Sequence, residues 1–267
     1  MKSNSFKSYN KVLSRFNENG FIIINLLDKK LIALFQKKIL NKLKSISKKK
    51  KYHKKLAKLE RIEDYHKIGL NLSEHKDLTN SSGRFLNLSK RGIDPFINKK
   101  IDSIFEYFYG NEAPIIKYPK KKKFVNNVVG FRVVRPNEKI VAKFHSESTY
   151  GIHCFTLWIP LTGYNSKYTL KIIPKSHLFR HQEKNIIFNK EFSTAKIFKK
   201  KYIDRFGPSL RPNLNPGDAI FFHPDLIHGN SKNLGNKTRV NLEMRFYRKE
   251  IKFSVSKKRE IKRNNLN

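Results

Sequence analysis

The sequence predicts a mainly β fold of the sandwich or jelly-roll kind, preceded by an α-helical region. Up to about residue 110, apolar residues recur at helical spacing, whereas from about residue 115 short apolar or alternating runs are separated by Pro, Gly and Asn. Regularly spaced short strands are typical of jelly rolls. Aromatic residues make up 12% of the 267-residue chain, which also favours a β-rich core.

The N-terminal region is predicted to be mostly helical. Residues 6–19 have apolar side chains at helical spacing, and Gly20 follows as a helix stop. Residues 21–27 are short and β-branched, which predicts a strand, and Asp28 can cap a helix over residues 29–43. The lysine block at 48–58 predicts a solvated helix face or a mobile connection, and residues 93–109 predict an amphipathic helix before Gly110.

The remaining residues predict the β core and a tail. Predicted strands cover residues 128–134, 140–145, 154–161, 168–173, 219–222 and 239–247. We therefore divide the chain into a helical region (1–114) that packs on the core, a β core (115–248) and a basic tail (249–267), within one structural domain. The polar, basic tail is expected to fray.

The charge of the chain is extreme, because 58 Lys and Arg stand against 21 Asp and Glu, a net charge of +37. Such a balance suggests nucleic acid as a partner. However, lysine heavily outnumbers arginine, while Asn and Ile are abundant, as an AT-rich coding sequence produces. Base readers usually rely on Arg. We expect coding bias as the main cause and nonspecific polyanion binding as a secondary role.

Nothing in the sequence predicts export or a membrane span. No stretch stays apolar for the roughly 18 residues that a membrane helix needs. The apolar run 21–24 follows a charged leader and has no small-residue cleavage site after it. Cys154 is the single cysteine, which excludes an intrachain disulfide and fits a reducing compartment. The expected location is the cytoplasm.

Three residues form a candidate metal site. His145 and Glu147 end a predicted strand, where residues two apart point to the same side. His228 follows a Pro-Gly-Asp turn and a buried strand, so it can be presented beside that pair. Two imidazoles and a carboxylate make the facial triad of non-haem Fe(II) enzymes. His223 is a competing ligand, but its place within the strand favours packing or support of a ligand.

Eleven residues beyond His228, Arg239 begins a strand with a polar face. Alternation places Arg239, Asn241, Glu243 and Arg245 on one side of residues 239–247 and apolar residues on the other. A buried polar row is costly without a charged guest. A dicarboxylate such as 2-oxoglutarate is such a guest, because Arg binds carboxylates bidentately. The alternative is a solvent-facing edge strand.

Together these motifs resemble the phytanoyl-CoA dioxygenase superfamily, most closely its streptomycin-biosynthesis-like branch. The likeness covers roughly residues 128–247. Its parts are the His-x-acid pair, a Trp-x-Pro-Leu strand from Trp158, an Ile-Pro-x-Ser-His turn ending at His177, a distal His-Gly-Asn and an Arg eleven residues on. We regard the His177 turn as structural and Trp158 as core packing.

The resemblance implies a double-stranded β-helix with N-terminal helices against one sheet. It implies iron ligands at His145, Glu147 and His228, and a 2-oxoglutarate salt bridge at Arg239, with Asn241 as a further donor to the co-substrate. From strand alternation alone, Thr156 is expected to line the same cavity. The family usually has Asp in place of Glu147 and a hydroxyl residue in place of Asn241. The implied reaction is hydroxylation of a small metabolite by molecular oxygen. The metabolite is expected to be anionic or sugar-linked.

Three other classes stay open. A nucleic-acid-modifying oxygenase would share the iron site and use the positive charge, although no base-flipping loop is evident. A non-catalytic jelly-roll binding protein would make the three ligands a coincidence. A cupin-type iron enzyme without 2-oxoglutarate would make Arg239 unnecessary.

Overall fold

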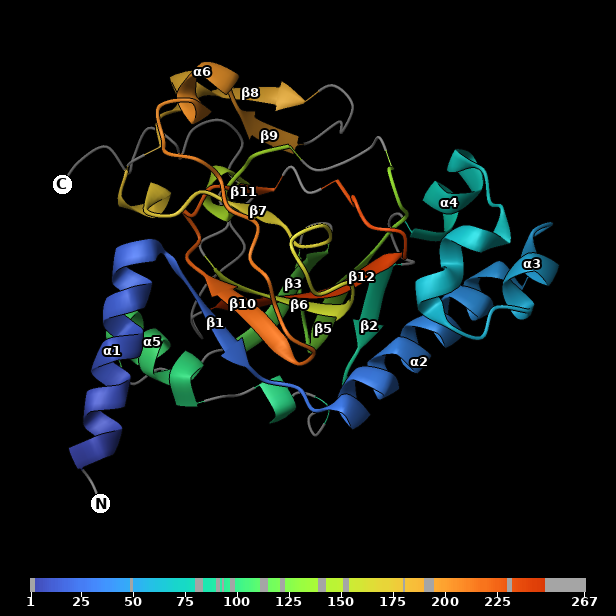
Figure 1. Cartoon of the computed structure of the whole chain (residues 1–267), viewed down its shortest axis with the longest axis horizontal. Coiled ribbons are helices and arrows are strands. Elements are labelled where there is room, and N and C mark those ends of the chain that lie inside the picture. The colour runs from blue at the N-terminus through green and yellow to red at the C-terminus, as the bar shows by residue number, and fades with distance from the viewer. Residues whose placement is uncertain are drawn as a thin grey trace.

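The computed structural model describes residues 3–48, 50–79, 84–89, 92, 94–96, 99–110, 115–120, 123–138, 143–150, 154–179, 181–189, 195–229 and 232–247. The predicted tail 249–267 and residues 140–142 of a predicted strand lie outside these ranges. Figure 1 shows a β core with helices beside it. No helix among the described residues is long and apolar enough to cross a membrane.

The N-terminal helices begin and end close to the predicted residues. α1 spans Ser3–Asn19 and ends at Gly20, whose φ of 79° lies in the left-handed region that glycine tolerates best. Strand β1 (Phe21–Asn25) follows, and then α2 (Lys29–Ser47), where Leu31 N donates to the Asp28 cap at 2.7 Å. The predicted stop, strand and cap are therefore confirmed.

Further short elements complete the region. They are α3 (His53–Ala57), η1 (Ile62–Ile68), α4 (Leu72–Thr79), strand β2 (Phe85–Asn87), η3 (Asp94–Phe96) and α5 (Lys99–Tyr109). The helix predicted over 93–109 is thus a 3-10 turn followed by a shorter helix. The lysine block at 48–58 is not simply a solvated face, because it contains α3 and buries Tyr52 and Leu56.

An antiparallel eight-stranded sheet forms the main layer. Its order runs through β1, β10 (Asp218–Phe222), β6 (Phe155–Thr162) and β12 (Arg239–Tyr247). Beyond β12 lie β5 (Val128–Val134), which carries β2, and β3 (Ile115–Lys120), which carries β4 (Lys123–Asn126). β12 is paired on both sides, so it is not the solvent-facing edge strand of the alternative.

A smaller layer faces the main sheet. It consists of β7 (Lys171–Ile172) and β11 (His228–Gly229), extended by isolated bridges from Leu210 to β7 and from His145 to β11. An apolar cluster joins the two layers: Trp158, Leu170, Ile172, Leu214, Ile220, Phe222 and Leu226. Two antiparallel layers around such a cluster form the predicted jelly roll, with Trp158 packed in the core as expected.

The segment between β7 and β10 is a long insertion with short elements of its own. It contains η5 (Ser176–Leu178), η6 (Glu183–Asn185), the hairpin of β8 (Ile186–Asn189) with β9 (Ala195–Phe198), and α6 (Lys200–Ile203). In Figure 1 the hairpin and α6 lie at the opposite end of the core from the start of α2. Phe198 N donates to the carbonyl of Phe144 at 3.0 Å, which ties the hairpin to the segment before His145.

The outer face of the main sheet packs on the N-terminal helices. One apolar cluster contains Phe16 of α1, Phe35 and Ile39 of α2 and Phe105 of α5, together with the outward side chains of β6 and β12. Burying each Leu or Phe of this kind contributes about 1.5–3 kcal/mol. The predicted packing of the helical region against one sheet is therefore observed, and it leaves the inner face for other roles.

The Pro-Gly-Asp turn lies at the start of β10 and is hydrogen-bonded to the residues that follow β1, the neighbouring strand. Gly217 has a φ of 95°, and its carbonyl accepts from the backbone N–H groups of Leu26 and Leu27 at 2.8 and 3.1 Å. A Cβ on Gly217 would stand 2.1 Å from the carbonyl oxygen of Leu27. Only glycine fits this approach, so the turn that starts β10 is confirmed with its expected cause.

Two strand predictions need correction. The described part of residues 140–145 forms no strand, and His145 makes only an isolated bridge to His228. Residues 168–170 belong to a turn region, so β7 keeps only Lys171 and Ile172 of the predicted 168–173. Side-chain and turn hydrogen bonds, such as Thr169 Oγ1 to the carbonyl of Pro212 at 2.7 Å, take the place of ladder bonds there.

Candidate metal centre

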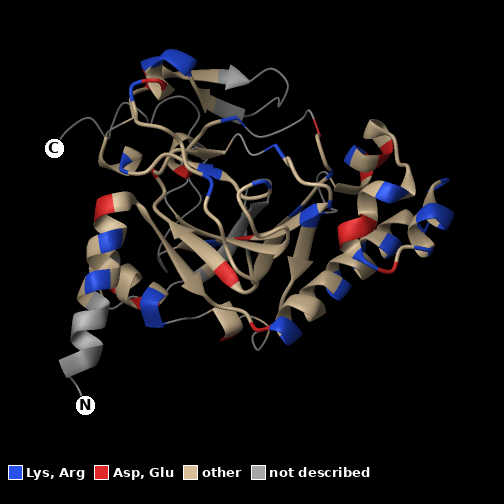
Figure 2. Cartoon of the chain, viewed as in Figure 1, with Lys and Arg blue, Asp and Glu red and all other residues tan. Residues whose placement is uncertain are grey.

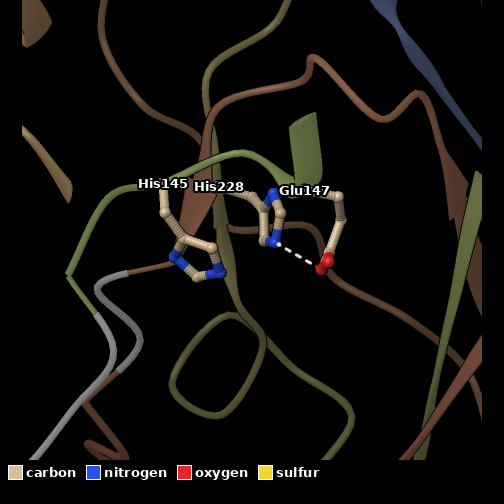
Figure 3. Close-up of side chains that lie close together, drawn as sticks. All are labelled: His145, Glu147 and His228. Atoms are coloured by element: carbon tan, nitrogen blue, oxygen red, sulfur yellow. Dashed lines mark ion pairs between the residues drawn. The ribbon is translucent and has the colours of Figure 1, made fainter. Parts of the chain in front are cut away.

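His145, Glu147 and His228 converge at one point between the two layers. One ligand atom from each lies within 4.8 Å of the others, and all three residues are buried. Figure 3 shows both imidazole rings and the carboxylate directed into one space, with His228 Nε2 3.9 Å from Glu147 Oε1. This is the grouping that the sequence predicts.

Backbone pairing sets the separation of the two histidines. His145 N donates to His228 O at 3.0 Å, and His228 N donates to His145 O at 2.9 Å. The residues are therefore directly opposed across an antiparallel bridge, and their ring centroids stand 4.5 Å apart. These two backbone hydrogen bonds hold the histidines side by side, whatever the packing of their side chains.

Glu147 reaches the same point by a route that differs from the predicted one. It begins η4 (Glu147–Tyr150), so it does not lie on a strand with His145. The 3-10 turn brings its carboxylate beside the histidines, and Thr149 N and Oγ1 both donate to the carbonyl of Ser146 to hold that turn. The predicted convergence is observed, but the strand alternation offered as its cause is wrong.

Hydrogen bonds fix the tautomer of both rings. His145 Nδ1 donates to the carbonyl of Lys143 at 2.7 Å, and His228 Nδ1 donates to the carbonyl of Leu226 at 2.9 Å. Each Nε2 is thereby left as the lone-pair donor. Burial lowers the pKa of His145 to about 4, with His228 adding to the effect, and burial likewise lowers the pKa of His228. Both rings are therefore neutral at neutral pH.

The carboxylate of Glu147 is charged despite its burial. Burial raises the pKa of this carboxyl, but Arg245 and the two histidines together lower it by more. The pKa therefore falls below its usual value. Arg245 Nη2 lies 2.7 Å from Glu147 Oε2. Two neutral imidazoles and one carboxylate are the donor set of a non-haem iron site, so the residues present fit Fe(II).

The polar row predicted on β12 lines the interior beside this group. Val240, Leu242, Met244 and Phe246 belong to the outer apolar cluster, so the alternate residues Arg239, Asn241, Glu243 and Arg245 face inward. Arg239 and Asn241 are 4% and 0% exposed. The expectation that a guest balances the whole row is too broad, because Glu243 pairs with Arg132 and Arg245 pairs with Glu147.

Arg239 and Thr156 stand at different ends of the row. Arg239 Nη1 donates to the carbonyl of Tyr168 at 2.9 Å. Thr156 of β6 is opposite Arg245, which is six residues, or about 20 Å of strand, from Arg239. Asn241 lies between them, opposite Pro160, and within the described structure its buried Oδ1 has no hydrogen-bond partner.

Arg132 and Arg135 differ in direction. Their three-residue spacing places them on opposite faces of an extended segment, so at most one of them can point inward. Arg132 does, with its Nε 2.5 Å from Glu243 Oε1. Arg135 instead donates to the carbonyl of Leu70 at 2.6 Å. The ion pairs of Glu243 and Arg245 are not predictable from strand alternation, because it gives a face and not a partner.

His223 lies outside the metal group. It follows β10, and its ring packs 5.7 Å from Phe155 and 5.3 Å from His177 in centroid distance. Its Nδ1 accepts from Asp225 N at 3.1 Å. His177 also lies outside the metal group, and its Nε2 donates to the carbonyl of Asn17 at 2.9 Å. Both histidines have the structural roles that the sequence favours.

The family of the chain follows from a family model. Residues 16–241 match the model described as phytanoyl-CoA dioxygenase. The match covers both the helical region and the jelly roll. The chain belongs to the phytanoyl-CoA dioxygenase family. This membership confirms the predicted enzyme class, the 2-oxoglutarate-dependent oxygenases.

Solved structures agree in fold. The alpha-ketoglutarate-dependent epimerase SnoN from nogalamycin biosynthesis is 14% identical, with a TM-score of 0.54 over 91% of this chain and 81% of that one. EctD from S. alaskensis, crystallised with 2-oxoglutarate and 5-hydroxyectoine, is 15% identical, with a TM-score of 0.53 over 89% and 75%. The carbocyclase SnoK is 15% identical, with a TM-score of 0.52 over 88% and 82%. No curated protein matches the chain.

Proposed function

We propose that the protein uses Fe(II) and 2-oxoglutarate to hydroxylate a small metabolite, with iron held by His145, Glu147 and His228. The single observation that carries this proposal is the convergence of these side chains to within 4.8 Å. Iron and 2-oxoglutarate, when bound, supply the oxidising chemistry by which oxygen hydroxylates a C–H bond, with succinate and carbon dioxide as co-products. The protein supplies ligands, orientation and exclusion of water.

Arg239 is the proposed anchor of the co-substrate's distal carboxylate. Its guanidinium is buried on the inner face of β12, where a carboxylate accepts a charge-assisted, bidentate pair of hydrogen bonds. Asn241, two residues along the same face, offers an amide to the same ligand. Thr156 lies at the Glu147 end of the row, so we propose that it lines the iron end of the pocket.

The proposed substrate is anionic or sugar-linked, and the proposed location is the cytoplasm. The excess of 58 Lys and Arg over 21 Asp and Glu supports an anionic group. The buried thiol of Cys154 suits a reducing compartment. Figure 2 shows Lys and Arg spread over α1, α2, α4 and α6, which supports salt-sensitive, nonspecific polyanion binding at most.

Alanine variants of the three ligands test the proposal. His145→Ala, Glu147→Ala and His228→Ala should each abolish Fe(II) binding, measured by anaerobic titration calorimetry, while circular dichroism shows an intact fold. Wild-type protein should release succinate when 2-oxoglutarate and oxygen are added. His223→Ala is the matched control and should keep iron, because His223 packs against aromatic rings outside the group. Loss of iron in His223→Ala but not in His228→Ala would refute the ligand assignment.

A further inference from the structure

The two oxygens of the Glu147 carboxylate have different neighbours. Oε1 lies 3.9 Å from His228 Nε2, on the side where the ligand atoms converge. Oε2 lies 2.7 Å from Arg245 Nη2. One oxygen therefore faces the metal group, while the other faces a guanidinium.

The contact between Arg245 and Glu147 is enclosed. The side chains of Arg245 and Glu147 are only 13% and 5% exposed. Such a pair is screened much less than a surface ion pair, so its geometry is held more firmly. Cys154 and Tyr247 lie within electrostatic range of both Arg245 and Glu147. The ion pair is therefore largely shielded from water.

Glu147 needs such a support more than the two histidines do. Both histidines are held by backbone hydrogen bonds to each other and by Nδ1 bonds to carbonyls. Glu147 begins a short 3-10 turn, and its carboxylate lies beyond three rotatable side-chain bonds. An ion-pair partner that holds a ligating carboxylate in place before the metal arrives raises metal affinity.

The position of Arg245 separates it from the proposed co-substrate anchor. It stands opposite Thr156 on β6, which is itself opposite Phe222 on β10, whereas Arg239 pairs with Val134 at the other end of β12. The two arginines share a face but lie about 20 Å apart along the strand. They therefore meet different partners.

We propose that Arg245 is a positioning residue that holds Glu147 Oε2 and so presents Oε1 alone to the iron. The inference rests on the proposed function, since it assigns a role toward the same metal. The proposal also predicts the direction of the change in Fe(II) affinity: removal of Arg245 should weaken iron binding. A guanidinium that merely competes with the metal for the carboxylate would have the opposite effect.

The test is anaerobic Fe(II) titration by calorimetry, without co-substrate. Arg245→Lys keeps the positive charge but lacks the planar guanidinium, and it should lower Fe(II) affinity about 10-fold. Arg245→Gln also removes the charge and should lower Fe(II) affinity about 10- to 100-fold. Arg135→Gln is the matched control, because the Arg135 side chain is 19% exposed and pairs with Glu138, which is not part of the metal group. This control should lose stability but not iron affinity.

Each other outcome overturns the inference. Unchanged or tighter Fe(II) binding in folded Arg245→Lys means that the arginine is structural or competes with the metal. Loss of 2-oxoglutarate affinity with normal Fe(II) affinity would make Arg245 a co-substrate residue. If wild-type protein itself binds no Fe(II), the proposed function fails first, and that result is distinct from normal wild-type binding with insensitive Arg245 variants.

Discussion

The two faces of strand β12 share one backbone and have opposite chemistry. On the outer face, Val240, Leu242 and Met244 are fully buried and Phe246 is 1% exposed, all within the cluster that reaches the N-terminal helices. On the inner face, Arg239, Asn241, Glu243 and Arg245 alternate with them and point toward the smaller layer. A single nine-residue strand thus serves both the stability of the fold and the proposed site.

The difference lies in what each face needs from its neighbours. The outer side chains need only a close-packed apolar surface against them. Helices from a distant part of the sequence provide that surface. The inner side chains need particular partners at hydrogen-bond distance, since a buried charge without one is costly. Substitutions on the two faces should therefore separate stability from ligand binding.

The largest effect is expected on the outer face. Phe246→Ala should lower the free energy of unfolding by about 3–5 kcal/mol, because it leaves a cavity between Phe155, Ile116 and Phe221. Urea unfolding of the metal-free protein measures this loss. Fe(II) affinity of the folded fraction should stay at the wild-type level. A fall in iron affinity instead of stability would break the separation of the two faces.

The next effect is expected from Arg239→Ala, in binding and not in stability. Loss of one partner of a buried charge pair costs about 2–5 kcal/mol, so the Kd of 2-oxoglutarate should rise by about 30-fold to several thousand-fold. Titration of 2-oxoglutarate into anaerobic Fe(II)-loaded protein measures it, and Arg239→Lys should rescue only in part. Should Arg245→Ala lose co-substrate binding while Arg239→Ala keeps it, the anchor is misassigned.

The sequence predicts the two faces of β12 but not the ion-pair partners of the inner face. The bounds of β12 and its two-residue alternation were predictable, because both depend on neighbours within the strand. The pairing of Arg245 with Glu147 and of Arg132 with Glu243 was not, since each pair joins residues about a hundred positions apart. Such partners depend on the register between strands, which one sequence without related sequences does not reveal.

Elements without an apolar pattern were also missed. β3 and β4 carry Lys117, Lys120 and Lys123, so their lysines hide the strand signal. The turn at Glu147 has no marker that distinguishes a 3-10 start from a strand end. In contrast, Gly217 and Asp28 were read correctly, because a left-handed turn and a helix cap each have a local cause.

The smallest effect is expected from Glu243→Gln, an inner-face change that acts through charge. Burial raises the pKa of this carboxyl, but the Arg132 guanidinium lowers it more, to about 2, from an ordinary value of 4.5. Because the folded pKa lies below the unfolded one, the carboxylate stabilises the fold above pH 4.5 and loses that contribution as the pH falls toward 2. Near neutral pH the variant should lose only about 1 kcal/mol, since Arg132 is 39% exposed and keeps contact with water.

The pH dependence of that loss distinguishes the two faces most finely. Urea unfolding of metal-free wild type and Glu243→Gln should differ most near neutral pH. The difference should shrink steadily below pH 4.5, because Glu243 of the unfolded wild-type chain takes up a proton there while the folded carboxylate stays charged down to about pH 2. Phe246→Ala is the control, because it removes no charge and its deficit should stay constant over the same range. A Glu243→Gln deficit that is equally constant would mean that the side chain contributes by shape, as the outer face does, and not by its ion pair with Arg132.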